Sequence, residues 1–176
     1  MFLKPLIQEG ILRQKPGYGN HVFVYQTIDA GEELLDLLKT FDETFIIYGC
    51  NKTQTDGNLV FKQFNEDEFY HDIAQAKAVI TNGGFTVISE ALYLKKPVFC
   101  FPINNQFEQI LNGKFVEKLG AGISSMQVNR EKMNMFFDNL DQYKKNLKQY
   151  NPENQQEILK QIEKEILEII SQTSNC

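Results

Sequence analysis

The stretch ITNGGFTVISEAL (residues 80–92) decides the fold, because an apolar run passes through two glycines directly into a helical pattern. Gly83 and Gly84 carry no Cβ, so a ligand can approach the backbone there. The first N–H groups of a helix have no intrahelical acceptor, and the helix dipole favours an anion beside them. The pattern therefore predicts a phosphate site at the amides of Gly84, Phe85 and Thr86, to which Thr86 can add its hydroxyl.

Glu90 lies one helical turn after Thr86 and therefore on the same face of the predicted helix. A carboxylate there repels a phosphate, but it can accept two hydrogen bonds from a vicinal diol. A nucleotide is a ligand that carries both a phosphate and a sugar diol. The residues alone also fit an ordinary strand-to-helix turn with a solvated glutamate, since Gly-Gly turns are common.

A second polar segment, PINNQFEQILNG (residues 102–113), follows the next predicted strand. Both segments come directly after strands, so in a parallel sheet they face the same crevice. Amides beside a carboxylate, as in Glu108 and Gln109, can bond several sugar hydroxyls at once. The residues also fit a polar helix start in which Glu108 lies near the positive end of the dipole.

Short apolar runs alternate with helical patterns along the rest of the chain. Strands without a polar face are typical of a parallel sheet that is covered on both sides. The sequence therefore predicts a doubly wound, mainly parallel six-stranded α/β domain in residues 21–150. A Pro- and Gly-rich linker without packed elements is expected in 1–20, and a C-terminal helix that packs on another domain in 151–176. Expected strands are 21–26, 44–50, 59–64, 78–81, 98–102 and 120–125; expected helices are 34–41, 65–76, 85–94, 105–119 and 129–149; residues 51–58 are expected to be a loop.

Composition narrows the class of protein. The 176 residues fit one domain, and 42% hydrophobic residues exclude a wholly disordered chain. A net charge of −5 disfavours nucleic acid as a partner. No apolar run is long enough to span a bilayer, and the first residues lack the apolar core of a signal peptide. The odd number of cysteines (Cys50, Cys100 and Cys176) and the two distant histidines (His21 and His71) indicate neither disulfides nor a metal, which favours the cytoplasm.

Two motifs in this order and spacing carry a family resemblance: NGGFTVISEALYLKKPVFCFP (82–102) and EQILNG (108–113). They resemble the donor-binding, C-terminal half of GT-B glycosyltransferases, in the group of the peptidoglycan N-acetylglucosaminyltransferase and its uncharacterised bacterial and archaeal relatives. The resemblance covers most of residues 21–125. It implies that residues 83–86 hold the donor diphosphate and that Glu90 binds the ribose. It also implies that Glu108 and Gln109 read the donor sugar.

The resemblance extends to two further positions. Phe64, at the end of the third expected strand, is similar to the position where the backbone meets the nucleobase, although a core aromatic fits there as well. Thr27 stands where the relatives keep a glycine-rich phosphate loop. This sequence has YQTIDAG (25–31) with the single glycine Gly31, a departure that leaves the first phosphate loop open.

The resemblance implies transfer of a sugar from a nucleoside-diphosphate sugar, UDP-sugar first, to an acceptor hydroxyl without a metal or cofactor. The helix start at 84–86 would replace the cation beside the leaving diphosphate. The general base is expected in an N-terminal acceptor domain, either in a longer chain or in a partner subunit that brings peripheral contact with the membrane. No catalytic residue is assigned here, and the chain alone is expected to be inactive. Two alternatives stay open: a nucleotide-sugar epimerase, for which His71 is a poor catalytic candidate, and a non-catalytic binding domain.

Overall fold

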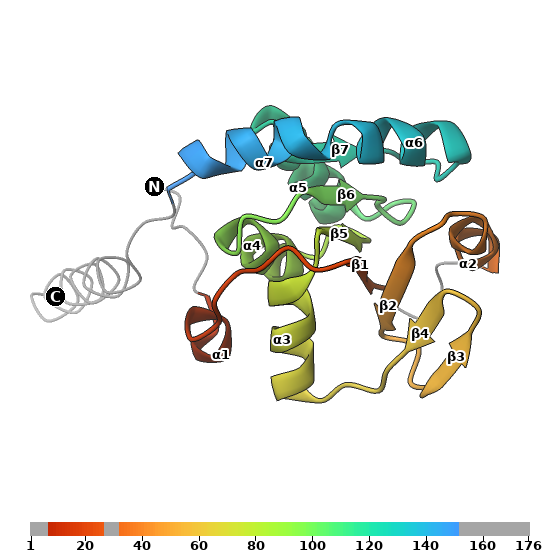
Figure 1. Cartoon of the computed structure of the whole chain (residues 1–176). Helices are drawn as coiled ribbons and strands as arrows, with labels where there is room; N and C mark the ends of the chain where they lie inside the picture. Colours follow the sequence, from red (N-terminus) through yellow and green to blue (C-terminus); the bar gives the residue numbers. More distant parts are fainter. Residues whose placement is uncertain (1–6, 27–31, 152–176) are drawn as a thin grey trace, which may run out of the picture.

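The computed structural model describes residues 7–26 and 32–151, which form a seven-stranded sheet with helices on both faces (Figure 1). The strand order is β3-β4-β2-β1-β5-β6-β7, and β3 alone among them runs antiparallel to its neighbour. The strands are β1 (His21–Tyr25), β2 (Thr44–Tyr48), β3 (Gln54–Asp56), β4 (Leu59–Phe61), β5 (Ala78–Thr81), β6 (Val98–Cys100) and β7 (Gly122–Ser124). The helices are α1 (Glu9–Leu12), α2 (Glu32–Lys39), α3 (Glu66–Gln75), α4 (Phe85–Tyr93), α5 (Phe107–Lys118), α6 (Arg130–Asp138) and α7 (Leu140–Gln149).

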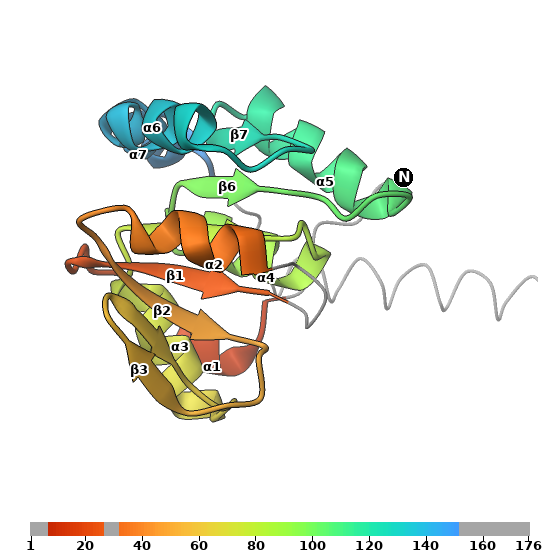
Figure 2. The ribbon, with the colours of Figure 1, turned by 90° about the vertical axis from the view of Figure 1, so that its right-hand side faces the viewer.

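The chain winds outward from β1 in two directions, as Figure 2 shows for β1, β2 and β6. On one side β1 pairs in parallel with β2, with His21 opposite Thr44. On the other side it pairs in parallel with β5, with Val22 opposite Ala78. The strand order therefore reverses between β1 and β5. In doubly wound sheets ligands bind beyond the carboxyl ends of the strands at such a point, and here β5 ends at the Gly83–Gly84 turn.

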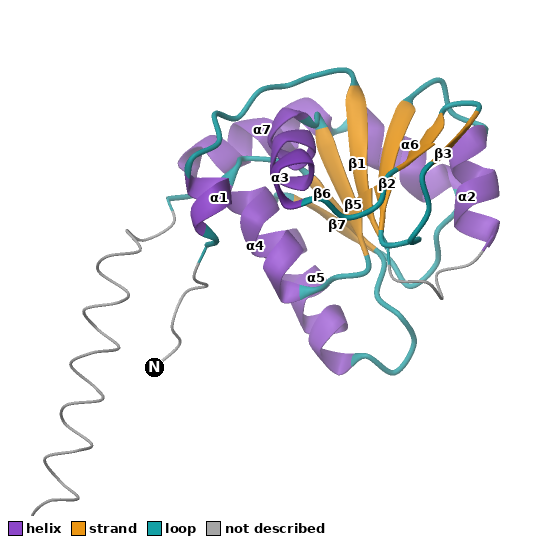
Figure 3. Ribbon diagram, turned by 90° about the horizontal axis from the view of Figure 1, so that it is seen from below, coloured by secondary structure: helices purple, strands orange, loops and turns teal. Residues whose placement is uncertain are grey.

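Helices cover both faces of the sheet (Figure 3), and each face carries its own apolar cluster. Neighbouring strand residues point to opposite faces, so Phe23 belongs to one cluster and Val22 and Val24 to the other. Helices α1, α3, α4 and α5 pack on the first face, and α2 and α6 pack on the second. Strand β5 is buried over its whole length, as its unbroken apolar run predicts.

The predicted six-stranded sheet is wrong by one strand. Residues 51–58 were expected to be a loop, but Gln54–Asp56 form β3, an edge strand that turns through Gly57 (φ +60°) into β4. All three residues of β3 are exposed, so their side chains carry no alternating apolar pattern. Antiparallel backbone pairing with β4 forms this strand.

The expected linker is packed where the structure describes it. Ile11 of α1 is fully buried, α1 lies against α3, and Gly17 N–H donates to Ala74 O at 2.9 Å. The buried Lys96 ammonium donates to the carbonyl of Gly17. The expectation that no packed element precedes the first strand is therefore wrong for residues 7–20.

Helix boundaries follow local chemistry. Asn65 caps α3 by accepting from Glu68 N–H at 3.1 Å, at the start of the helix expected over 65–76. The helix expected over 129–149 is two helices, because Asn139 leaves helical geometry (φ −105°, ψ 8°) and bonds the carbonyl of Met135 instead. The helix expected in 151–176 falls almost wholly outside the described residues, and its role stays a prediction.

Candidate functional site

The turn between β5 and α4 lets the helix begin without a side-chain cap. Gly83 has φ +97°, and a Cβ there would lie 2.8 Å from Cys100 Sγ. Gly84 is the N-cap residue, no side chain caps the helix, and a Cβ on Gly84 would meet open space. Residues 84–86 are all exposed. The structure therefore brings together the backbone cradle that the sequence predicted, with room for an anion at the positive end of α4.

Helix α5 holds this turn in place. Asn112 Nδ2 donates to Gly83 O at 2.9 Å. A Cβ on Gly113 would lie 2.2 Å from Ser124 Oγ, so α5 can approach β7 closely only with glycine at this position. Asn112 and Gly113 of the second motif therefore hold the Gly83–Gly84 turn in position.

Glu90 faces the interior of the protein. It is 2% exposed, so the alternative of a solvated glutamate is wrong. Burial raises the pKa of its carboxyl from 4.5 to about 7, and no cation among the described residues contributes to that pKa. A buried carboxylate without a counter-charge is costly and is typical of functional sites, where ligand hydroxyls can bond to it.

Phe64 belongs to an aromatic cluster on α3. The Tyr70 ring meets Phe69 at 6.1 Å between centroids, and Phe69 meets Phe64 at 5.3 Å. Burial, then Glu66 and Glu90, raise the pKa of the Tyr70 hydroxyl to about 12.

Phe64 differs from its expected place in one respect. The strand β4 ends at Phe61, so Phe64 lies in the loop between β4 and α3. Its side chain is 66% exposed, and the alternative of a core aromatic is wrong. An exposed ring on a buried aromatic support offers a face for stacking.

A buried polar network holds the loop that carries Phe64, and sequence reasoning missed it. Lys62 Nζ lies 2.7 Å from Asp72 Oδ2, and the Tyr48 hydroxyl donates to the same oxygen at 2.7 Å. Burial and then Asp72 raise the pKa of Tyr48. A signal was present, because Asp72 follows Phe69 by three positions and so shares its buried helix face.

Glu108 and Gln109 have different environments, although both lie in the first turn of α5. Glu108 is exposed. The Gln109 side-chain oxygen accepts from Ile103 N–H at 2.9 Å, so the amide ties α5 to the preceding loop. Its NH₂ group carries two further hydrogen-bond donors.

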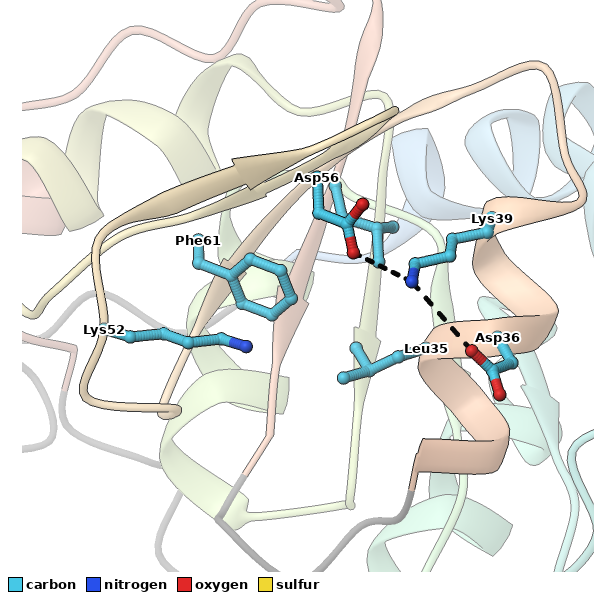
Figure 4. Close-up of a pocket in the computed structure, with 7 residues that line it drawn as sticks. Leu35, Asp36, Lys39, Lys52, Asp56 and Phe61 are labelled. Carbon is cyan, nitrogen blue, oxygen red and sulfur yellow. Dashed lines mark ion pairs between the residues drawn. The ribbon is translucent and has the colours of Figure 1, made fainter.

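Two hollows lie beside α2. One, of about 590 Å³, opens at the carboxyl edge of the sheet between α2, the β6–α5 loop and the β7–α6 loop. The other, of about 360 Å³, lies between α2 and the β3–β4 hairpin, where Lys39 pairs with Asp56 at 2.8 Å and Lys52 covers the Phe61 ring (Figure 4). No predicted site residue lines the second hollow.

Some predictions lie outside the described part of the chain. Thr27 and Gly31 fall in residues 27–31, so the first phosphate loop stays untested. Within residues 7–26 and 32–151 no group of three or more metal-binding side chains occurs, and no helix is long and apolar enough to cross a membrane. Among the described histidines, His21 begins β1 and bonds Asp72 O, and His71 is exposed on α3. Both histidines lie outside the turn between β5 and α4.

The sheet order, with the glycine turn at its carboxyl edge and the buried carboxylate on α4, defines a Rossmann-like α/β domain. The model of the family "Glycosyl transferase family 1" matches residues 1–141, and the chain belongs to this family. The resemblance inferred from the two motifs is thereby confirmed.

Curated relatives are bacterial enzymes named UDP-N-acetylglucosamine--N-acetylmuramyl-(pentapeptide) pyrophosphoryl-undecaprenol N-acetylglucosamine transferase. The Bacillus cereus protein is 28% identical over 142 residues, which cover 66% of this chain and 38% of the relative. The Clostridium novyi protein is 35% identical over 112 residues, which cover 58% of this chain and 30% of the relative. The chain thus spans about a third of the length of these relatives.

Solved structures show the same fold. The Acinetobacter baumannii MurG structure aligns with a TM-score of 0.58 at 17% identity, covering 89% of this chain and 52% of that one. A UDP-glucosyltransferase from Polygonum tinctorium aligns with a TM-score of 0.62 at 14% identity. The alignment covers 91% of this chain and 46% of that one. The chain therefore has the fold of one half of a GT-B glycosyltransferase, as expected.

Proposed function

We propose that this chain is the donor-binding part of a glycosyltransferase that moves a sugar from a nucleoside-diphosphate sugar to an acceptor hydroxyl. The observation that carries the proposal is the pairing of an open α4 start with the buried Glu90 on the same helix. The helix start suits a diphosphate, and the carboxylate suits the two ribose hydroxyls. A nucleotide-binding site needs a group for the diphosphate and a group for the ribose.

The remaining predicted residues supply groups for the other parts of the donor. Phe64 offers an exposed ring on which the base can stack. Glu108 and Gln109 lie in the first turn of α5, the helix that holds the glycine turn, and can bond the sugar hydroxyls. The names of the curated relatives favour UDP-N-acetylglucosamine as the donor.

The chemical role of the chain is electrostatic. Negative charge grows on the leaving diphosphate as the glycosidic bond breaks, and fixed N–H groups at the α4 start stabilise that charge without reorganisation. This role needs no metal ion or other cofactor. The residues that activate the acceptor belong, in this proposal, to an acceptor-binding part supplied by further chain or by a partner subunit.

The names of the relatives also specify an undecaprenol-linked acceptor, which supports a place of action at the cytoplasmic face of a membrane. We include this location in the proposal. It does not depend on any membrane contact by the described residues.

A thermal-shift and calorimetric titration with UDP, GDP and ADP tests the proposal. We expect UDP to bind and to raise the melting temperature; at about 100 times its Kd a ligand adds about 2.7 kcal/mol to the unfolding free energy. Glu90→Ala should weaken UDP binding by about 1–3 kcal/mol. Failure of every nucleoside diphosphate to bind would favour the non-catalytic alternative. Turnover of the donor by the chain without an acceptor would favour the epimerase.

A further inference from the structure

The hollow between α2 and the β3–β4 hairpin has a volume of about 360 Å³ and lies at the edge of the sheet (Figure 4). Its volume is within the range of small-molecule sites. Leu35 of α2 and Leu59 and Phe61 of β4 form the apolar part of its lining. None of the residues proposed for the nucleotide donor lines this hollow, so it is separate from the site described above.

The charged groups of the lining are unequally paired. Lys39 Nζ lies 2.8 Å from Asp56 Oδ2 and 4.0 Å from Asp36 Oδ1. The hydrogen bond with Asp56 raises the pKa of Lys39. Both carboxylates of the lining therefore share one ammonium group. Lys52 Nζ lies over the Phe61 ring, 3.8 Å from its centroid, and pairs with no carboxylate of the described residues. Lys52 is thus the group of the lining that is left for an anion.

The position of Lys52 suits a ligand inside the hollow. Figure 4 shows the ammonium groups of Lys52 and Lys39 on opposite sides of it, with Phe61 and Leu35 between them. The face of an aromatic ring attracts a cation, so the Phe61 ring favours an ammonium group at this place. A ligand whose anionic group meets Lys52 can lay an apolar body against Phe61 and Leu35. A second negative charge on the ligand would have no further cation to meet, since Lys39 is already paired.

We propose that this hollow binds a small organic acid with a single carboxylate and an apolar body. Lys52 pairs with the carboxylate, and the three apolar lining residues contact the body. A hydrogen bond between two charged groups is stronger than one between neutral groups, and burial of the apolar body adds affinity. The inference does not rest on the proposed function, because the hollow shares no residue with the donor site.

NMR titration of the full chain with phenylacetate tests this inference. Phenylacetate should shift the amide signals of Leu35, Lys39, Lys52 and Phe61. It should bind at least about fivefold more tightly than phenylethanol, phenethylamine or phenyl phosphate, which are its neutral, cationic and doubly anionic analogues. Equal affinity for the acid and the alcohol would overturn the inference. Shifts at residues 84–86 in place of those four would also overturn it, because the acid would then lie at the start of α4.

The variant Lys52→Met measures the contribution of the cation, since methionine keeps an unbranched apolar stem. We expect it to weaken phenylacetate binding at least about fivefold and to leave phenylethanol binding unchanged. Lys145→Met is the matched control, because Lys145 is an exposed lysine on α7 and does not line the hollow. Equal losses in the two variants, or no loss in either, would overturn the inference. UDP takes part in none of these measurements, so such a failure leaves the proposed function unaffected.

Discussion

Replacing Glu90 by glutamine tests whether this carboxylate is held out of water for a ligand. Glu90 is 2% exposed, and burial raises its pKa from 4.5 to about 7. One unit of pKa corresponds to about 1.4 kcal/mol of difference between the two protonation states. The ionised carboxylate therefore destabilises the folded chain by up to about 3 kcal/mol above the folded-state pKa.

The pH dependence follows from the sign of this difference. The folded pKa lies above the unfolded one, so between pH 4.5 and about 7 the folded chain binds the proton more tightly. The contribution of Glu90 to the unfolding free energy is therefore complete below this window and is lost as the pH rises through it. Glutamine is uncharged at every pH. We expect Glu90→Gln to match the parent near pH 4.5 and to exceed its stability by up to about 3 kcal/mol near pH 8.

Urea denaturation of both proteins across this pH range measures the difference. Glu108→Gln is the matched control, because the same chemical change is made at an exposed position and should alter stability by less than about 0.5 kcal/mol at any pH. Near pH 8 the Glu90→Gln variant should also bind UDP at least about tenfold more weakly, since hydrogen bonds to a charged acceptor are stronger.

Two results would refute the reasoning. A difference between parent and Glu90→Gln that is constant across the pH range would show that Glu90 is not desolvated. A variant that binds UDP as tightly as the parent would remove the carboxylate from the ribose site. We expect the Glu90→Gln variant to be more stable than the parent and to bind UDP more weakly, as when a destabilising group is retained for function.

Three further substitutions test other parts of the structure. Gly83→Ala should destabilise the chain by about 1–3 kcal/mol, because the left-handed backbone and the tight contacts there exclude a Cβ, whereas Gly84→Ala should be almost neutral in a melting experiment. Phe64→Ala should weaken UDP binding by about 1–3 kcal/mol, measured by calorimetry, if the Phe64 ring stacks on the base. Phe107 is a comparably exposed phenylalanine, and Phe107→Ala should leave UDP binding unchanged. Equal effects of the two substitutions on UDP binding would contradict the assignment of Phe64. Lys62→Met leaves a buried carboxylate without its cation and should lower the unfolding free energy in urea by about 1–3 kcal/mol, while an unchanged midpoint would show that the ion pair is not stabilising.

Local patterns predicted most of the fold. The unbroken apolar runs placed β1, β2, β5 and β6, because a strand buried on both faces needs no polar residues. The Asn65 cap and the glycine turn placed the starts of α3 and α4. The edge strand β3 had no such signal, since its exposed side chains contribute nothing to the core. Residues 7–20 resembled a linker because Pro and Gly are frequent there, and only contacts with α3 and Lys96 show that they are packed.

The sequence by itself determined which groups are available at the site: two glycines before a helix, a carboxylate one turn later and an amide-rich loop after the next strand. These are local features, because turn geometry and helical spacing depend on neighbouring residues. Only the tertiary structure decided the environment of each group. Burial raises the pKa of Glu90, the Ile103 amide donates to the Gln109 side-chain oxygen, and Asp72 holds the loop of Phe64. Burial and hydrogen bonding are set by elements far apart along the chain, so no spacing within one segment can predict them.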